Sequence, residues 1–149
     1  MPIGYREKIL IIALIFATLV FSGCDKSISP KLDQKSLYGT WSWLKSVGGI
    51  TGEEKTPKSV GYNLFYVFKT DSTFELYKLE LPGGKTLEIK CKFWVAKEKW
   101  TNYSDSVEIL YYQNNQIEPQ RIEFLEGNDW AVLHDLCIDC FDNTLVRID

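Results

Sequence analysis

The clearest structural signal in this chain is the stretch Thr86-Leu87-Glu88-Ile89-Lys90-Cys91-Lys92-Phe93-Trp94-Val95-Ala96. Apolar residues stand at every second position from 87 to 95, and most of the residues between them are charged. Successive side chains of a β-strand point to opposite faces, so this alternation is typical of a strand with one buried face. The stretch therefore predicts a strand whose inner face carries Leu87, Ile89, Cys91, Phe93 and Val95.

Similar alternation recurs on both sides of this stretch. Turn residues such as Pro82-Gly83-Gly84 separate the apolar segments. The apolar phase shifts within residues 73–81, which predicts a β-bulge, and residues 48–58 are expected to form a loop. No segment after residue 23 shows a helical period longer than two turns. We expect the remaining strands over residues 37–45, 61–69, 73–81, 105–113, 120–126, 130–135 and 143–148.

Sequential strands joined mostly by short turns favour an up-and-down meander, and closing such a sheet into a barrel removes its unpaired edges. We therefore predict that residues 36–149 form an all-β domain, an eight-stranded antiparallel up-and-down barrel. The alternation alone also fits a flattened sandwich. A barrel of eight strands is just wide enough to be filled by its own side chains or to hold one small ligand. Because the domain is rich in aromatic residues, a filled interior and a cavity both remain open.

The first 23 residues resemble the signal peptide of a bacterial lipoprotein. Arg6 and Lys8 precede an uncharged run of 13 residues from Ile9 to Phe21, whereas a membrane-spanning helix needs about 20. A short apolar run behind basic residues is typical of a signal peptide. Ser22-Gly23 then precede Cys24, as at a lipoprotein processing site. The resemblance implies cleavage after Gly23 and acylation of Cys24, for example with palmitate. The alternative is an uncleaved N-terminal anchor.

Residues 24–35 are polar and contain a proline, so we expect them to form a lipidated tether between the membrane and the domain. Two or more acyl chains hold a protein stably at a bilayer, whereas one does so only marginally. The predicted location is the cell envelope, with the outer membrane or the cell surface favoured. Asp25 leaves the inner membrane open, because an aspartate there resembles a retention signal of some Gram-negative lipoproteins.

The charge of the chain argues against two classes of partner. The net charge is −3, and it becomes −4 without residues 1–23, because this segment carries two basic residues and one acidic residue. A mildly acidic domain is not suited to bind nucleic acid. It is equally unsuited to electrostatic adsorption on a membrane, which needs clustered lysines and arginines. We expect a monomer that contacts the membrane through the lipid on Cys24.

The domain resembles the lipocalins in two short motifs. Gly39-Thr40-Trp41 matches the Gly-x-Trp motif at the start of the first lipocalin strand, and Arg147 lies in the last predicted strand. Segments 68–74 and 132–147 are similar to small bacterial lipocalin-like domains. The resemblance implies a barrel in which Arg147 packs over Trp41. A guanidinium over an indole gains roughly 0.5–2 kcal/mol, so this pair is expected to act as a structural clasp.

Four side chains suggest metal or redox chemistry, namely those of His134, Cys137, Cys140 and Cys91. Thiolates and an imidazole can form a tetrahedral Zn²⁺ site. A disulfide that uses Cys137 or Cys140 and unmodified thiols are the alternatives, and at least one of the three cysteines left after Cys24 stays unpaired within one chain. The aspartates at 135, 139, 142 and 149 lack the spacing of a known calcium loop. We expect no metal site and no cofactor.

Catalysis is not expected. His134 is the only histidine, and the chain has no Gly-x-Ser-x-Gly elbow. The first hypothesis is a membrane-anchored, lipocalin-like lipoprotein that binds a small apolar ligand without catalysis. The alternative is an envelope module with a filled barrel that binds a protein or a polysaccharide through Trp94, Trp100 and Tyr103, since exposed rings can anchor a partner.

Overall fold

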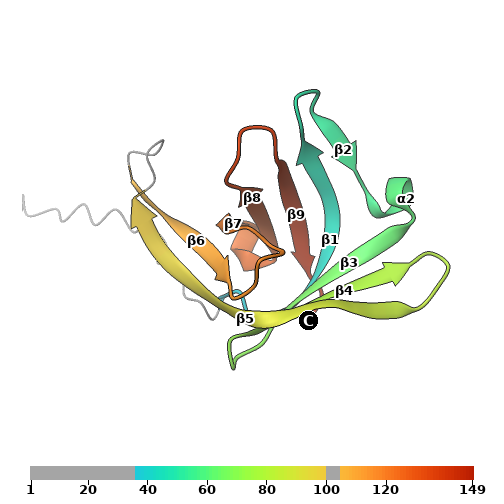
Figure 1. Ribbon diagram of the computed structural model, residues 1–149, viewed down its shortest axis with the longest axis horizontal. Coiled ribbons are helices and arrows are strands. Elements are labelled where there is room, and N and C mark those ends of the chain that lie inside the picture. Colours follow the sequence, from blue (N-terminus) through green and yellow to red (C-terminus); the bar gives the residue numbers. More distant parts are fainter. Residues whose placement is uncertain (1–35, 100–104) are drawn as a thin grey trace, which may run out of the picture. The chain divides into compact units, whose positions relative to one another are not determined.

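The computed structural model describes residues 36–99 and 105–149, and almost all of their regular structure is β-sheet (Figure 1). The short helical elements of the described residues include α2 (Pro57–Val60) and the 3₁₀ turn η2 (Glu126–Asn128). The strands are β1 (Gly39–Gly48), β2 (Glu53–Lys55), β3 (Tyr62–Phe68), β4 (Thr73–Glu80), β5 (Lys85–Lys99), β6 (Ser106–Tyr112), β7 (Gln120–Leu125), β8 (Trp130–Asp135) and β9 (Phe141–Arg147).

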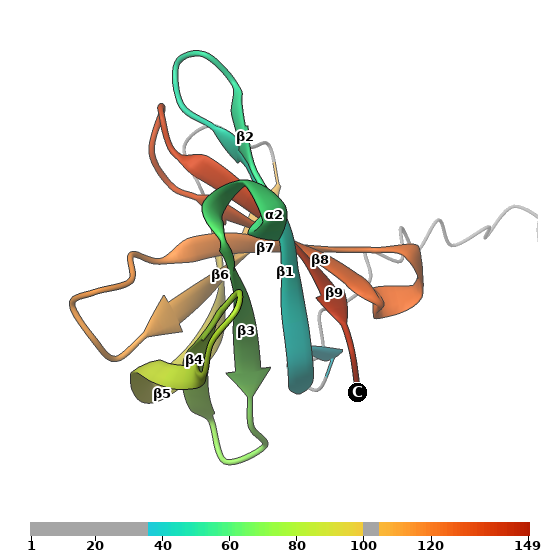
Figure 2. The ribbon, with the colours of Figure 1, turned by 90° about the vertical axis from the view of Figure 1, so that its right-hand side faces the viewer.

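The sheet closes on itself. All strand pairs are antiparallel, and from β3 to β9 each strand pairs with the next one along the chain. β1 pairs with β3 on one side and with β9 on the other, from Trp41 opposite Arg147 to Gly48 opposite Phe141. Figure 2 shows β1 beside both partners. This β1–β9 seam confirms the predicted eight-stranded antiparallel up-and-down barrel and excludes the flattened sandwich.

The predicted loop over residues 48–58 contains regular structure that the sequence analysis missed. β2 pairs only with the end of β1, so it is not one of the eight strands that close the barrel. α2 is a single turn, with Thr56 and Ser59 capping each other and Pro57 in the first turn. The chain leaves this turn at Gly61, whose φ of +78° favours glycine. Elements this short show no periodic pattern, so apolar spacing cannot reveal them.

The predicted bulge is present, but the extra residue lies in the neighbouring strand. Leu76 pairs with Ile89 and Tyr77 pairs with Leu87, so Glu88 of β5 has no partner in β4. An extra residue reverses the inside–outside alternation of the strand. As a result, the prediction that Leu87 lies on the inner face is wrong, and the side chain is 49% exposed. The inner-face assignment of Phe93 is confirmed, because its side chain is buried.

Aromatic rings fill much of the barrel. Phe74 and Phe68 lie 5.0 Å apart between ring centroids, and Phe74 also contacts Tyr112 at 4.9 Å. Closely spaced, tilted rings of this kind contribute both apolar burial and favourable ring–ring contacts. The buried core consists of Leu37, Trp41, Trp43, Tyr66, Phe68, Phe74, Phe93, Leu110, Tyr112, Ile122, Ala131, Leu133 and Leu145.

The alternating strand directions give the barrel two distinct ends. The connections at residues 49–61, 81–84, 113–119 and 136–140 share one end, which we call the mouth. The connections at residues 69–72 and 126–129 share the opposite end with the start of β1 and the end of β9. We call this opposite end the clasp end, because Trp41 and Arg147 lie there.

A buried carboxylate on the outside of the barrel joins β4 to β5 and to the β3–β4 connection. Glu75 is 4% exposed, and its carboxylate accepts from Lys69 at 2.8 Å, Lys90 at 3.0 Å and the Tyr77 hydroxyl at 2.9 Å. Hydrogen bonds from the two lysines lower the pKa of Glu75 from its ordinary value of 4.5 to about 2. Folding therefore favours the ionised carboxylate.

This pKa shift predicts a specific acid sensitivity. The stabilisation by Glu75 is complete above its ordinary pKa of 4.5 and is lost as the pH falls from there towards 2. Because the lysines are exposed, we expect only about 1–2 kcal/mol at pH 7. Urea unfolding of Glu75→Gln at pH 7 should show this loss relative to the wild type, and the two proteins should converge near pH 2. A loss that stays constant with pH would contradict the shift. Glu53→Gln, at an exposed and loosely paired carboxylate, is the matched control.

Candidate functional site

The structure places Arg147 against Trp41 at the clasp end. The guanidinium carbon lies 4.3 Å from the centroid of the Trp41 ring, and the indole is completely buried. Arg147 also donates hydrogen bonds to the backbone carbonyls of Ser36 and Tyr38, which precede β1, and of Asn128 between β7 and β8. One side chain thus ties three segments together, as a structural clasp would.

Several residues singled out from the sequence lie outside the described part of the chain. Cys24, the predicted acylation site, and the whole of segments 1–23 and 24–35 are among them, as are Trp100 and Tyr103. Among the described residues, no helix is long and apolar enough to cross a membrane.

The cysteine and histidine side chains do not assemble a metal centre in the described residues. Cys137 and Cys140 form a disulfide in the β8–β9 connection. Cys91 is a free thiol that packs against the core, and burial raises its pKa. His134 lies with Nδ1 2.9 Å from Asp142 and Nε2 3.4 Å from Glu123. Since the disulfide has consumed two thiols, the four side chains cannot act together as zinc ligands.

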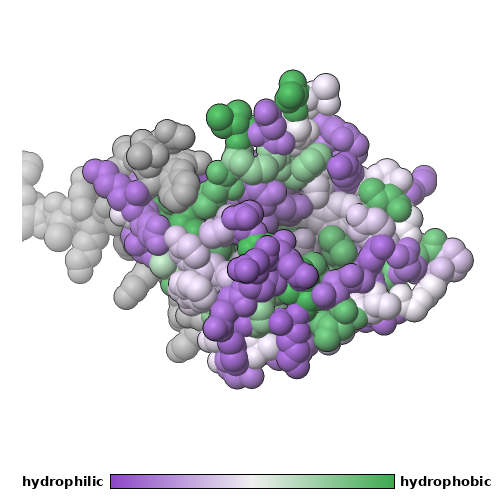
Figure 3. Space-filling view, viewed as in Figure 1, coloured by the Kyte–Doolittle hydropathy of each residue, from purple (hydrophilic) through white to green (hydrophobic). Residues whose placement is uncertain are grey.

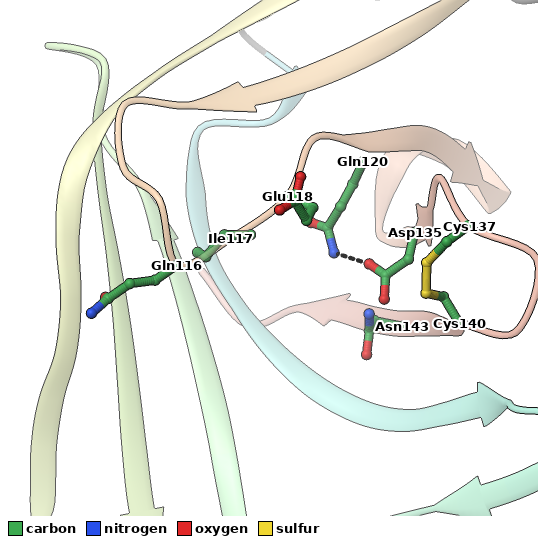
Figure 4. A pocket seen from close by; sticks show the side chains of 8 residues that line it. All are labelled: Gln116, Ile117, Glu118, Gln120, Asp135, Cys137, Cys140 and Asn143. Atoms are coloured by element: carbon green, nitrogen blue, oxygen red, sulfur yellow. Dashed lines mark hydrogen bonds between the residues drawn. A yellow bond between two sulfur atoms is a disulfide. The ribbon is translucent and has the colours of Figure 1, made fainter.

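The candidate site is a pocket of about 300 Å³ at the mouth of the barrel. It lies between the β6–β7 connection and the ends of β8 and β9, and Figure 4 shows the side chains that surround it. Most of them carry carboxylate or amide groups, and Ile117 is the one aliphatic member. The pocket is lined by Gln116, Ile117, Glu118, Gln120, Asp135, Cys137, Cys140 and Asn143.

One wall of the pocket is held by a hydrogen-bonded chain that starts in the core. The hydroxyl of buried Tyr112 donates to Oε1 of Gln120 at 2.9 Å, and Nε2 of Gln120 donates to Oδ1 of Asp135 at 2.7 Å. Gln120 is only 6% exposed. Burial raises the pKa of Tyr112 well above its usual range, so its hydroxyl keeps the proton that it donates. These two hydrogen bonds therefore fix the amide orientation of Gln120 and the position of Asp135.

A second set of hydrogen bonds holds Asn143, which lies on β9 beside the end of β8 that carries Asp135. Nε1 of buried Trp43 donates to Oγ of Ser46 at 2.9 Å, and Ser46 donates in turn to Oδ1 of Asn143 at 2.6 Å. Ser46 and Asn143 are opposite each other in the β1–β9 seam. Because Oδ1 of Asn143 accepts this bond, its amide nitrogen is directed away from Ser46. In Figure 4 the amide of Asn143 and the carboxylate of Asp135 point toward one another.

These two chains give the mouth a defined recognition chemistry. Asp135 uses one oxygen for Gln120, and no other hydrogen bond or ion pair of Asp135 occurs among the described residues. Buried polar groups in a network of this kind are held rigidly, because losing a partner is costly in a poorly solvated site. The pocket thus presents a carboxylate oxygen and an amide in fixed positions above a core filled with aromatic rings.

Sequence reasoning did not assign these mouth residues to a site, although one signal was present. Gln120 begins a strand in which Ile122 is buried, so a polar residue occupies the inward phase at a strand end. Polar residues that point inward at the open end of a barrel indicate that they line a pocket there. Asn143 gave no such signal, because only the β1–β9 register brings it next to Ser46.

A second candidate surface lies on the outside of β5 and β6. Trp94 is 47% exposed and stacks on Tyr111, with ring centroids 5.3 Å apart and planes 7° from parallel. The Tyr111 hydroxyl donates to Glu98 at 2.7 Å, which fixes the ring. On the face that Figure 3 shows, hydrophilic residues predominate and hydrophobic ones form separate spots. Isolated apolar residues on a surface are ordinary.

No family model, curated protein or solved structure matches this chain.

Proposed function

We propose that this protein is a lipid-anchored, lipocalin-like binding module of the bacterial cell envelope, which takes a small molecule at the mouth of its barrel without transforming it. The observation that carries the proposal is the mouth pocket, whose Gln120, Asp135 and Asn143 are held by hydrogen bonds from the buried core. Concave sites with a few well-placed polar groups are where small ligands bind.

The residues that line the pocket favour a different kind of ligand from the small apolar one expected from the sequence. A small apolar ligand would need an apolar cavity, yet rings fill much of the interior, and five of the eight residues that line the mouth carry a carboxylate or an amide group. We therefore propose that the ligand makes its main contacts with polar groups. Binding without catalysis is supported by the positions of the reactive side chains. Within the described residues His134 contacts two carboxylates and no hydroxyl or thiol nucleophile, and both cysteines at the pocket are joined in a disulfide.

Native mass spectrometry of the protein extracted from its host membranes tests the binding proposal. We expect a fraction of the protein to carry a small molecule that denaturing conditions release. Recovery of only ligand-free protein, under conditions in which a known envelope binding protein keeps its ligand, would contradict the proposal.

Metabolic labelling with palmitate tests the proposed anchor separately. The wild type should incorporate label, and Cys24→Ser should lose it and keep residues 1–23, because the acylated cysteine directs processing in lipoproteins. Cys91→Ser removes a cysteine elsewhere and should be labelled like the wild type. Equal labelling of all three proteins would contradict acylation at Cys24.

The alternative function is an envelope module that binds a polysaccharide or a protein through the outer surface. The stacked and exposed Trp94–Tyr111 pair favours it, since such rings offer a flat contact area. Pull-down of envelope polysaccharides and proteins after photocrosslinking next to Trp94 should recover a partner if this surface is used. Recovery that Trp94→Ala leaves unchanged would contradict this alternative.

A further inference from the structure

We infer that the mouth pocket selects a small organic cation that carries a primary ammonium group. This inference rests on the proposed binding function and adds the chemical class of the ligand. Its basis is the combination of a cavity, two carboxylates without a cationic partner, and hydrogen-bonded chains that orient the lining toward the cavity.

The lining of the pocket contains acidic side chains and no basic ones. Glu118 and Asp135 line the pocket, and no lysine, arginine or histidine does. Several other carboxylates of the described residues have lysine partners, as in the pairs Glu54–Lys45, Glu75–Lys69 and Glu80–Lys78, whereas Glu98 and Asp149 accept from Tyr111 and from the backbone of Thr40. Neither Glu118 nor Asp135 has an ion pair within the described part of the chain. A cationic ligand would supply the partner that the fold does not.

The orientation of Asp135 favours a hydrogen-bond donor. Gln120 cannot turn its carbonyl toward Asp135, because Tyr112 donates to that carbonyl. The amide N–H therefore holds Oδ1. The second carboxylate oxygen has no hydrogen bond among the described residues, and a ligand could bind it beside the amide of Asn143, which points toward this carboxylate (Figure 4). An ammonium group has three N–H donors and no acceptor. It could thus bond to Asp135 and to Glu118 without placing an acceptor against either carboxylate.

Other ligand classes fit this lining less well. An anion would meet two carboxylates in a pocket that lacks basic side chains. Calcium takes six to eight oxygen ligands, usually with several carboxylates among them, whereas no group of three or more suitable side chains converges in the described residues. An ammonium group needs fewer contacts than a divalent ion, so two carboxylates are sufficient.

The test uses three probes that share a five-carbon chain and differ at their ends: cadaverine, 1,5-pentanediol and glutarate. The full chain is titrated with each by isothermal calorimetry in uncharged detergent at low ionic strength. We expect binding of cadaverine, no measurable binding of the diol or the dianion, and weaker cadaverine binding as salt is added.

Matched variants locate the binding. Asp135→Asn keeps the shape and the acceptor for Gln120 but removes the charge, and we expect the affinity for cadaverine to fall about tenfold or more. Glu118→Gln, at an exposed position, should give a smaller loss of about two- to threefold. Asp139→Asn makes the same change in the β8–β9 connection, close in sequence to Asp135 but outside the lining, and it should bind like the wild type. Circular dichroism shows whether each variant is folded.

Each other result overturns the inference. These results are equal binding of the three probes, no binding of cadaverine, an unchanged affinity in both folded pocket variants, or a pocket-dependent response to Ca²⁺ in place of cadaverine. If the protein from host membranes carries a small molecule but fails this test, the cation inference is wrong and the proposed binding function stands. If it carries no small molecule and also fails this test, both are wrong.

Discussion

Replacing Trp41 with alanine is expected to lower the free energy of unfolding by about 3–5 kcal/mol. Trp41 is completely buried, packs on Phe124 at 5.8 Å between ring centroids, and donates from Nε1 to the carbonyl of Leu37 at 2.9 Å. The substitution leaves a large cavity at the clasp end. It also removes the ring over which the Arg147 guanidinium lies, so the clasp loses its apolar base. Urea unfolding followed by circular dichroism measures the loss.

Trp94→Ala is the matched control, because it removes the same side chain from the outside of the barrel. Trp94 is 47% exposed, and its truncation leaves no internal cavity. We expect a loss of about 1 kcal/mol or less, arising from the stacking on Tyr111. Equal losses for Trp41→Ala and Trp94→Ala would show that the clasp end does not contain the packed core described above.

Gly48→Ala is expected to destabilise the protein by about 2–3 kcal/mol, by overpacking rather than by a cavity. A methyl group on Gly48 would lie 2.1 Å from the carbonyl oxygen of Cys140 and 2.6 Å from Cα of Phe141. Both are backbone atoms, so the end of the β1–β9 seam must move apart to accept it. We expect lower resistance to urea, and in amide exchange the largest change should appear at this seam.

Gly84→Ala controls for the general effect of replacing a glycine. Nothing lies within 4 Å of a methyl group at this position in the β4–β5 turn, so its stability should stay within about 0.5 kcal/mol of the wild type. If Gly48→Ala were as mild as Gly84→Ala, the close approach of β1 and β9 at the mouth would be contradicted.

The strands could be predicted from the sequence because half-buried strands alternate strictly. Residues 89–93 are an example, since Ile89, Cys91 and Phe93 alternate with two lysines and the structure places all five residues in β5. The bulge was visible as a phase shift in residues 73–81, but a single strand cannot show which partner carries the extra residue. Glu88 carries it, and Leu87 consequently lies outside the predicted inner face.

The packing of side chains inside the barrel was less predictable than the strands that form it. Alternation assigns a residue to a face, but it does not show whether the rings meet and fill the space. Phe68, Phe74 and Phe93 do meet, with centroid distances of 5.0 and 5.1 Å from Phe68. The candidate pocket lies at the mouth, where residues from three separate segments converge.

The mouth pocket depends on tertiary contacts that no local pattern contains. Asn143 reaches Ser46 across 97 positions of the chain, and Gln120 reaches Asp135 across 15. The Cys137–Cys140 disulfide was one of the alternatives that the spacing allowed. The anchor at Cys24 and the cell-envelope location, in contrast, depend on the sequence alone and stay predictions that labelling would test.

Closure of the barrel through the β1–β9 seam is the central structural claim, because the clasp and the mouth both depend on it. Cross-strand nuclear Overhauser effects in the isotopically labelled protein measure it directly. The register predicts contacts between the backbone protons of Ser42 and Val146 and between those of Ser46 and Asn143, with slowly exchanging amides along the seam. Absence of these contacts, with fast exchange on both strands and intact pairing of β8 with β9, would show an open sheet and contradict the barrel.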